Sequence, residues 1–373
     1  MATTVSRGFG CPHKYIQGPG EFRNLEKYIS GYGQKVLMLI DSFLFDRFEA
    51  MISEVYAESS TEYKTVRFQG ECSRPEIARV STIASEFGAD VVVGIGGGKA
   101  LDAVKLVADG LGTALVIIPT SAATDAPTSA LSVIYTEDGV HDGSQKQKRH
   151  SDLVLMDTEI IMTAPVRLFV SGMGDALATL FEAKAIVAAD RPNGIGQGYR
   201  PCKAAMAIAQ QSYDIIMEKG VQAKLALENG VLSPALEDVI EANTLLSGLG
   251  FENTGCAAAH GVHAGLTELP QTHSFYHGEK VAFGLLCQLV LENAPQWQID
   301  ELISFYLQVG LPLTLADFNV EATKENVYII ANKTVNGNAL VHNEHFAITV
   351  ETVSAAIVTA DALGRQALAA TGK

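Results

Sequence analysis

The sequence has little basic charge and few cysteines, and both shortages exclude classes of protein. Lys and Arg number 27 against 42 Asp and Glu, a net charge of −15. Nucleic-acid binding depends on clustered basic residues, so we expect no nucleic-acid partner. The five cysteines are scattered and lack a C-x-x-C pair, which argues against a disulfide framework and against a thiolate zinc site. We expect buried thiols in a reducing cytoplasm.

Long apolar runs are also missing. No stretch of roughly 18 or more apolar residues occurs, so we expect no membrane span. Residues 1–20 contain several polar and basic side chains and no apolar segment, which predicts no secretory signal and a cytoplasmic location. With 373 residues, 47% of them apolar, the chain is long enough for two globular domains.

The most informative stretch that is present spans residues 90–105. Residues 91–93 are apolar and β-branched, which favours a buried parallel strand. A glycine-rich turn follows, and residues 100–108 show helical spacing. A helix N-terminus after such a turn binds anions, and the diphosphate of a dinucleotide is the expected ligand. Packing alone also explains a glycine-rich turn, and the pattern is neither G-x-G-x-x-G nor a Walker A loop.

Strands and helices alternate in the first part of the chain. The expected strands cover residues 35–41, 63–68, 90–94 and 115–120, with helices at 75–86 and 100–108. This order predicts a doubly wound parallel sheet, in which ligands bind at the carboxyl ends of strands. Asp41, the turn at Gly96 and Thr120 all lie at such ends.

The pattern of apolar residues changes near residue 163. Helical spacing dominates from there on, at residues 174–188, 204–217, 235–249 and 279–292. We therefore predict an α/β N-terminal, Rossmann-like parallel-sheet domain over residues 1–162 and an all-α C-terminal domain over residues 163–373. Residues 162–165 form the expected hinge, with a cleft between the domains.

Residues in the helical half could ligate a metal. Asp175 opens a predicted helix, His260 and His263 lie in another, and His277 opens a third. One carboxylate with two or three imidazoles suits zinc or iron(II), and three protein ligands leave a position for substrate. Each residue also has a structural explanation: Asp175 as an N-cap, His260 as a hydrogen-bonded core histidine, and His277 as part of a first helical turn. His263 is a ligand, a supporting group or neither.

The segment after the strand at 115–120 is a polar loop over residues 119–130. Its hydroxyl groups and the carboxylate of Asp125 could hold a ribose, a phosphate or a polyol. An ordinary turn cluster of Ser, Thr, Asp and Pro explains the composition equally well.

Together these segments resemble the zinc-dependent polyol branch of the iron-containing alcohol dehydrogenase superfamily. Five motifs carry the resemblance over nearly the whole chain, at residues 94–102 (GIGGGKALD), 119–127 (PTSAATDAP), 174–183 (GDALATLFEA), 250–260 (GFENTGCAAAH) and 277–284 (HGEKVAFG). The resemblance implies a dehydroquinate synthase-like fold. It also implies reversible, NAD-dependent oxidation of glycerol to dihydroxyacetone, with hydride leaving a secondary alkoxide on zinc.

The resemblance further implies which residues act. One Zn²⁺ per subunit would be held by Asp175, His260 and His277, which also contact the substrate together with Asp125. Asp125 and His263 are the implied catalytic residues. The implied cofactor contacts are Asp41, Gly96, Gly97, Gly98, Lys99, Asp102, Thr120, Ala123, Ser129, Leu131 and Tyr135. The implied assembly is a homo-oligomer, an octamer, with a small polyol as its partner.

Two positions refine these expectations. Iron-type members of the superfamily carry a histidine four residues after the aspartate, whereas this chain has Thr179, which favours a three-ligand zinc site. Asp41 ends a strand where the adenosine ribose is expected, and a carboxylate there repels a 2′-phosphate, so NAD is favoured over NADP.

Other functions remain open. A related vicinal-diol or alcohol dehydrogenase fits the same motifs. A glycerol-1-phosphate dehydrogenase or a dehydroquinate-synthase-like enzyme would want several basic residues, but the segments around His260 and His277 supply only Lys280. A catalytically silent nucleotide-binding protein would keep the glycine turn and need no metal.

Overall fold

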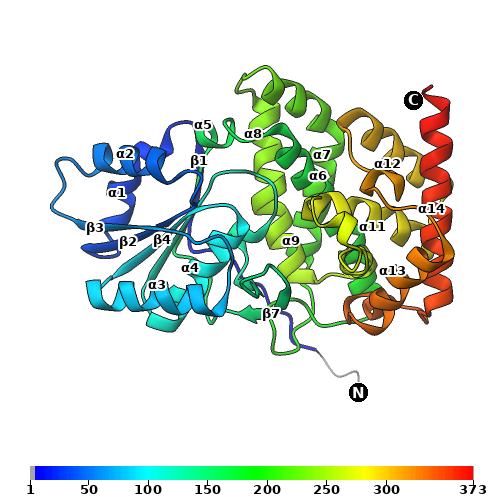
Figure 1. The fold of residues 1–373 in the computed structure, drawn as a ribbon, viewed down its shortest axis with the longest axis horizontal. Coiled ribbons are helices and arrows are strands. Elements are labelled where there is room, and N and C mark those ends of the chain that lie inside the picture. The colour runs from blue at the N-terminus through cyan, green and yellow to red at the C-terminus, as the bar shows by residue number, and fades with distance from the viewer. Residues whose placement is uncertain (1–4, 373) are drawn as a thin grey trace. The chain divides into compact units, whose positions relative to one another are not determined.

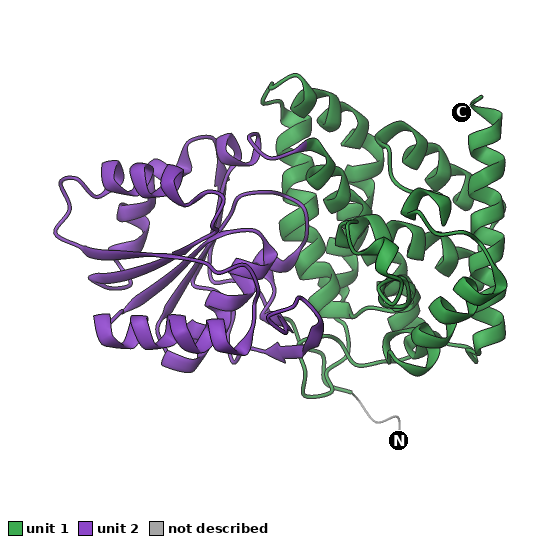
Figure 2. Cartoon of the chain, in the orientation of Figure 1, with its two compact units in different colours: residues 1–9, 166–373 green, residues 10–165 purple. Residues whose placement is uncertain are grey.

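The computed structural model describes residues 5–372, and the chain divides into two compact units (Figure 2). The sheet unit comprises residues 10–165, and the helical unit comprises residues 1–9 and 166–373. The boundary at Pro165 lies close to the expected residue 162. The segment before Gly10 belongs to the helical unit, although the prediction placed it in the first domain.

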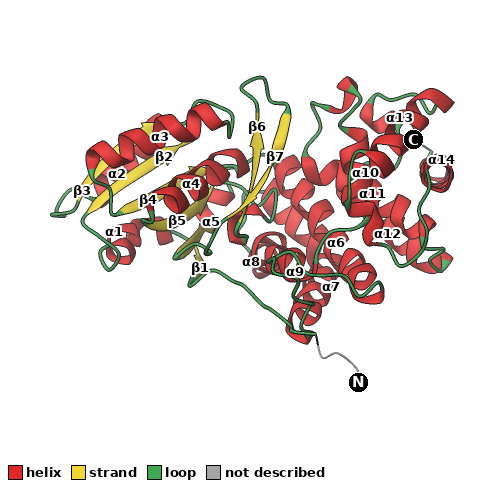
Figure 3. Cartoon of the chain, turned by 90° about the horizontal axis from the view of Figure 1, so that it is seen from below, coloured by secondary structure: helices red, strands yellow, loops and turns green. Residues whose placement is uncertain are grey.

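The sheet unit is built on a parallel sheet, six-stranded in the described residues, in the order β1-β8-β5-β4-β2-β3 (Figure 1). Its strands are β1 (Tyr15–Gly18), β2 (Lys35–Ile40), β3 (Glu62–Arg67), β4 (Val91–Gly96), β5 (Ala114–Pro119) and β8 (Leu153–Asp157). Strands β6 (Leu131–Tyr135) and β7 (His141–Lys146) form a separate antiparallel pair (Figure 3). The predicted parallel sheet is confirmed.

Helices cover both faces of this sheet. The helices of this unit are α1 (Leu25–Ile29), α2 (Phe45–Val55), α3 (Arg74–Phe87), α4 (Gly98–Leu111) and α5 (Thr158–Ile161). Leu37 and Leu39 of β2 belong to a core cluster with α3 and α4. Val36, Met38 and Ile40 point the other way, into a cluster with α1 and α2. Because successive side chains of a strand alternate between faces, one continuous apolar strand supplies both cores.

The helical unit consists mainly of α-helices (Figure 3). They are α6 (Val166–Ala188), α7 (Lys203–Glu228), α8 (Pro234–Glu241), α9 (Ser247–Thr254), α10 (Ala258–Leu266), α11 (His277–Leu291), α12 (Gln296–Val309), α13 (Lys324–Asn336) and α14 (Val350–Ala370). A π-helical turn at Ala242–Leu246 separates α8 from α9. No helix in residues 5–372 is both long and apolar enough to cross a membrane.

Two expectations about local structure were wrong. Helix α6 begins at Val166, so Asp175 lies inside a helix and does not cap its N-terminus. The predicted helix at 235–249 is interrupted by the π-helical turn, which apolar periodicity does not reveal. By contrast, His277 is the first residue of α11, as predicted.

A buried lysine ties α4 to the loop that follows β5. The Lys105 side chain is 2% exposed and donates to Asp102 Oδ1 at 3.0 Å. It also donates to the carbonyl oxygens of Ala126 and Leu131, at 2.5 and 2.9 Å. One ammonium group therefore fixes both ends of the segment 126–131, which contains two of the predicted cofactor residues, Ser129 and Leu131.

We predict that Lys105→Met lowers the free energy of unfolding by about 3–5 kcal/mol, because it leaves the buried Asp102 carboxylate without its cation. Urea unfolding measures this. The matched control is Lys224→Met, which removes a more exposed pair with Glu228 and should cost less than about 1 kcal/mol. Equal losses in both variants would contradict the structural role of Lys105.

Candidate functional site

Three helices of the helical unit bring a carboxylate and two imidazoles together. The ligand atoms of Asp175 in α6, His260 in α10 and His277 in α11 all lie within 4.8 Å of one another. Nε2 of His277 is 3.1 Å from Oδ1 of Asp175, and Nε2 of His260 is 3.5 Å from the same oxygen. The structure therefore brings together the three residues that the family resemblance implies as metal ligands.

The surroundings of Asp175 fit a divalent cation. The residue is 1% exposed, and neither carboxylate oxygen accepts a hydrogen bond from any residue in the described part of the chain. A buried carboxylate that accepts no hydrogen bond is costly. One oxygen ligand with two imidazole nitrogens is a donor set that suits zinc or iron(II). A cation at this point would therefore satisfy the orphaned oxygens.

Glycines beside two of these residues allow their helices to approach closely. A Cβ atom on Gly278 would overlap the carbonyl of Ser171, and one on Gly174 would lie 2.5 Å from the carbonyl oxygen of Gly278. Only glycine fits where two helix backbones are this near. The Gly-Asp and His-Gly pairs of the sequence therefore have a physical reason, since each glycine brings the neighbouring Asp175 or His277 to the cluster.

Glu182 orients His260. This fully buried carboxylate accepts a hydrogen bond from Nδ1 of His260 at 2.7 Å, and from the backbone N–H groups of Ala257 and His260 at 2.7 and 3.0 Å. A carboxylate accepts, so Nδ1 carries a hydrogen, and Nε2 faces Asp175 with a lone pair whenever His260 is neutral. Glu182 is not among the residues predicted from the sequence. Its spacing of seven residues from Asp175, on one helix face, is the signal that could have found it.

His263 contacts His277 and not the carboxylate. Nε2 of His263 lies 3.0 Å from Nδ1 of His277, with ring centroids 4.3 Å apart. Burial, together with the nearby charges of His277 and Lys280, holds the pKa of His263 well below its usual value. A neutral imidazole can accept a hydrogen bond from His277. The catalytic role assigned to His263 stays a prediction.

The charges of the cluster are coupled. Burial alone would raise the pKa of Asp175, but His277 and His260 outweigh it and lower that pKa. Burial would lower the pKa of His260, but Cys256, Glu182 and Asp175 outweigh it and raise that pKa. Asp175 therefore stays ionised. A proton on His260 opposes a cation, so metal affinity should fall in acid.

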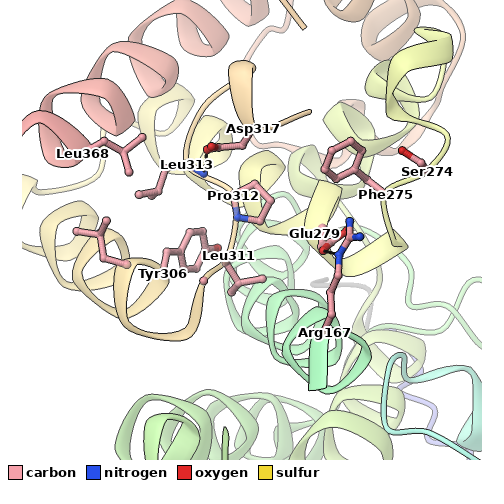
Figure 4. Close-up of a pocket in the computed structure, with 12 residues that line it drawn as sticks. Arg167, Ser274, Phe275, Glu279, Tyr306, Leu311, Pro312, Leu313, Asp317 and Leu368 are labelled. Atoms are coloured by element: carbon pink, nitrogen blue, oxygen red, sulfur yellow. Dashed lines mark hydrogen bonds and ion pairs between the residues drawn. The ribbon is translucent and has the colours of Figure 1, made fainter. Parts of the chain in front are cut away.

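An ion pair beside a pocket fixes the start of α11. Nε and Nη2 of Arg167 lie 2.5 and 2.9 Å from the two carboxylate oxygens of Glu279 (Figure 4). Glu279 also accepts the backbone N–H of Tyr276 at 2.7 Å. The adjoining pocket, of about 450 Å³, is lined mainly by apolar side chains and by none of the predicted ligands. The ion pair thus holds the helix end that carries His277.

Glu344 supports the N-terminus of α10. Oε1 of this 3%-exposed residue accepts the backbone N–H of Ala258 at 3.2 Å. Burial and the neighbouring Glu292 raise the pKa of Glu344 to about 8. The folded protein therefore favours the protonated form of this carboxyl group.

We predict a pH-dependent stability from Glu344. Its folded pKa lies above the value of 4.5 expected in the unfolded chain, so its contribution is complete below that pH and is lost as pH rises toward about 8. Urea unfolding across this window should show a smaller decline for Glu344→Gln than for the unchanged protein. Glu228→Gln, at a more exposed carboxylate, should leave the decline as it was. An identical decline in Glu344→Gln would refute the assignment.

The sheet unit presents its own group of predicted residues. Asp41, Gly96 and Thr120 follow or end neighbouring strands, and backbone hydrogen bonds align them, Asp41 to Ile95 at 2.9 Å and Thr120 to Gly96 at 3.1 Å. The helices after β2 and β4 cover opposite faces. The carboxyl ends of these two strands therefore form a topological switch point, where nucleotides bind in such sheets.

The glycine turn suits a bound phosphate. Gly96 has φ 156°, and a Cβ there would lie 2.9 Å from Cβ of Asp41. Gly97 precedes α4, and a Cβ on it would meet nothing within 4 Å. Gly98 is the first residue of that 14-residue helix. An open helix N-terminus with free N–H groups favours an anion.

Two predicted cofactor residues have protein partners. Nζ of Lys99 pairs with Glu71 at 2.5 Å and lies 5.2 Å from the ring centre of Tyr135, whose pKa burial raises to about 12. Asp102 is 6% exposed and is bonded to Lys105 and to a backbone N–H of β6 at 2.9 Å. These bonds give Asp102 a structural role, while its contact with the cofactor stays a prediction.

The remaining predicted residues lie between β5 and β6. Asp125 is 8% exposed and precedes a short 3₁₀ helix at Ala126–Thr128. Ser129 donates to the carbonyl of Ala126 at 3.3 Å, and the carbonyl of Leu131 accepts from Lys105. Ala123 lies in the same loop, so the group forms one segment. No contact with a ligand is tested, and these roles stay predictions.

The fold and the site define a class of protein. A doubly wound sheet with a glycine turn at its switch point, and a helical unit with an Asp-His-His cluster, agree with the superfamily that the motifs resemble. The chain belongs to the iron-containing alcohol dehydrogenase family, whose family model matches residues 12–158.

Whole-chain relatives narrow this class. The chain is 44% identical to glycerol dehydrogenase from Citrobacter freundii, over 96% of this chain and 98% of the relative. It is 40% identical to glycolaldehyde reductase from Halobacterium salinarum, again over 96% and 98%. A probable glycerol dehydrogenase from Sinorhizobium meliloti superposes with a TM-score of 0.91, at 44% identity, covering 97% of this chain and 100% of the other. The predicted family resemblance, fold class and oxidoreductase assignment are confirmed.

We predict that Asp175→Asn abolishes stabilisation by divalent zinc. A ligand present at 100 times its Kd stabilises a protein by about 2.7 kcal/mol, and this gain requires the carboxylate at the centre of the cluster. Thermal unfolding with and without added zinc measures the shift. Asp317→Asn, at an exposed carboxylate of the pocket in Figure 4, should keep the zinc-induced shift. An unchanged shift in Asp175→Asn would place the ion elsewhere.

Proposed function

We propose that the protein oxidises glycerol at C2 to dihydroxyacetone with NAD as the oxidant. The cluster of Asp175, His260 and His277 carries this proposal, and the glycerol dehydrogenases among the relatives support it. The reaction removes a hydride from C2, which adds to the nicotinamide ring, and releases the hydroxyl hydrogen as a proton. We assign the nucleotide to the sheet unit and the metal to the helical unit.

The cluster residues would hold one zinc ion through an oxygen of Asp175 and Nε2 of His260 and His277. When bound, zinc supplies Lewis acidity that lowers the pKa of an alcohol. Thr179 has no imidazole to offer as a fourth ligand. Its hydroxyl group lies 3.0 Å from that of Ser247, and both residues are buried. A three-ligand set supports zinc over a four-ligand iron site.

Neighbouring side chains would keep the ligands in the correct protonation state. Glu182 holds the hydrogen on Nδ1 of His260, which leaves Nε2 free to ligate. Nδ1 of His277 would donate to Nε2 of His263, which frees Nε2 of His277 in the same way. His263 therefore acts on the reaction by orienting His277. Such supporting groups typically contribute about 10–100-fold in metal affinity or activity.

The sheet unit would bind NAD through its glycine turn and Asp41. The N-terminus of α4 suits the diphosphate, and the Asp41 carboxylate would accept hydrogen bonds from the adenosine ribose. Asp125 would accept a hydrogen bond from a hydroxyl of the polyol that is not oxidised. This contact would favour diols over simple alcohols.

A second candidate is the reduction of a short hydroxyaldehyde, which similarity to the glycolaldehyde reductase favours. A phosphorylated polyol is a weaker candidate. Lys280, the one lysine near the cluster in sequence, is 7% exposed, and its Nζ lies 3.5 Å from the carbonyl of Thr272.

We also propose that the protein is a homo-octamer located in the cytoplasm. Light scattering of the purified protein would test the octamer.

Metal add-back tests the proposed function. The protein is stripped with a chelator, and NAD reduction is measured with glycerol, 1,2-propanediol and glycerol 1-phosphate after adding zinc, iron(II) or manganese. NADH oxidation with glycolaldehyde covers the second candidate. We expect activity to vanish on stripping, to return best with zinc, and to be highest with glycerol. Full activity in the stripped protein, or a preference for the phosphate ester, would overturn the proposal.

We predict that Asp41→Asn relaxes the choice of cofactor. Loss of the negative charge removes repulsion of a 2′-phosphate, so the ratio of kcat/KM for NAD over NADP should fall at least tenfold, roughly 1.4 kcal/mol. Steady-state kinetics with both cofactors measure this. Asp138→Asn, in the exposed β6–β7 turn, is the matched control and should leave the ratio unchanged. An unaltered ratio in Asp41→Asn would remove Asp41 from the cofactor site.

A further inference from the structure

A second donor cluster shares His260 with the first. Glu182, Cys256 and His260 form a group whose ligand atoms all lie within 4.8 Å of one another. Glu182 is fully buried, whereas Cys256 and His260 are half-buried. The two ring nitrogens of His260 face different partners, because Nε2 lies toward Asp175 and Nδ1 lies 2.7 Å from Oε2 of Glu182.

The second cluster contains a softer metal ligand than the first. It adds a thiol to one imidazole and one carboxylate, whereas the first cluster contains no sulfur. Thiolate ligands select thiophilic ions such as zinc, cadmium and copper over magnesium, calcium or manganese. Three ligands at about 2.0–2.3 Å from one ion lie up to roughly 4.6 Å apart, so the observed spacing needs only small shifts.

The protein backbone holds Cys256 in place. It lies between α9 and α10, and its carbonyl oxygen accepts a hydrogen bond from the side-chain amide of Asn343 at 2.8 Å. The next residue, Ala257, donates its backbone N–H to Oε1 of Glu182 at 2.7 Å. The backbone N–H of Ala257 thus bonds to Oε1 of Glu182, and the other oxygen, Oε2, faces Nδ1 of His260. The backbone at Cys256 and the carboxylate of Glu182 are therefore held in place before any ion arrives.

We propose that Glu182, Cys256 and Nδ1 of His260 bind a thiophilic divalent cation that expels the catalytic metal. The ion takes the place of the hydrogen on Nδ1, and that hydrogen moves through solvent to Nε2. The thiol of Cys256 loses its proton to water, so one proton is released for each ion bound. With a hydrogen on Nε2, His260 no longer offers a lone pair to the ion beside Asp175. The two sites are thus mutually exclusive through one imidazole ring.

This inference rests on the proposed function only where it concerns the catalytic metal. The test begins with zinc-loaded enzyme, whose zinc content is measured first and tests the proposed function by itself. Cadmium chloride is then titrated in. Sulfur-to-cadmium charge-transfer absorption reports on Cys256, and a chromogenic indicator reports the zinc that is released. Neither readout depends on turnover.

We expect the absorption to rise in step with zinc release, to one cadmium per chain. Cys256→Ser should lose the absorption and require at least tenfold more cadmium to release zinc. Cys202→Ser, at another half-buried cysteine, is the matched control and should behave as the unchanged protein. Zinc release by the same cadmium concentration in Cys256→Ser would mean direct replacement beside Asp175 and would overturn the inference. So would zinc release without the absorption.

Discussion

The Asp175 carboxylate is buried against two imidazole nitrogens and receives no hydrogen bond from the described residues. A buried carboxylate without hydrogen bonds is unfavourable, and a cation between the carboxylate and the imidazoles would reduce that penalty. The packing around it serves this arrangement. Gly174 and Gly278 let two helix backbones meet, and Glu182 orients His260 so that its Nε2 faces Asp175.

In the sheet unit, too, glycines allow a close approach, here of the backbone to a ligand. The unit must bring backbone N–H groups close to an anion, and glycines at the end of β4 remove the side chains that would block the approach. The loop after β5 has no regular structure of its own beyond a short 3₁₀ turn, so Lys105 supplies its anchor from α4. The buried ammonium group of Lys105 therefore contributes to the stability of the sheet unit and also holds the loop where we expect the ligand to bind.

Much of this was predictable from the sequence. Long apolar strands such as β2 and β4 and the helix at 277 follow from periodicity and position. The ligand set of Asp175, His260 and His277 came from the family resemblance, since spacing alone left His263 open as a ligand. The short edge strand β1 and the polar strand β7 carry too little apolar pattern to predict. Glu182 and Lys105 depend on which side chains become buried together, and a linear pattern does not contain that. The π-helical turn likewise depends on packing, which the apolar pattern of the sequence does not contain.

The most direct test of the central claim is X-ray absorption at the zinc edge of protein loaded with one equivalent of zinc. The account predicts two imidazole nitrogens and carboxylate oxygen at about 2.0–2.2 Å, with no sulfur at about 2.3 Å. Asp175→Asn protein provides the comparison and should lose this signature. A sulfur ligand, or a first shell without imidazole, would contradict the assignment of Asp175, His260 and His277 as the metal site.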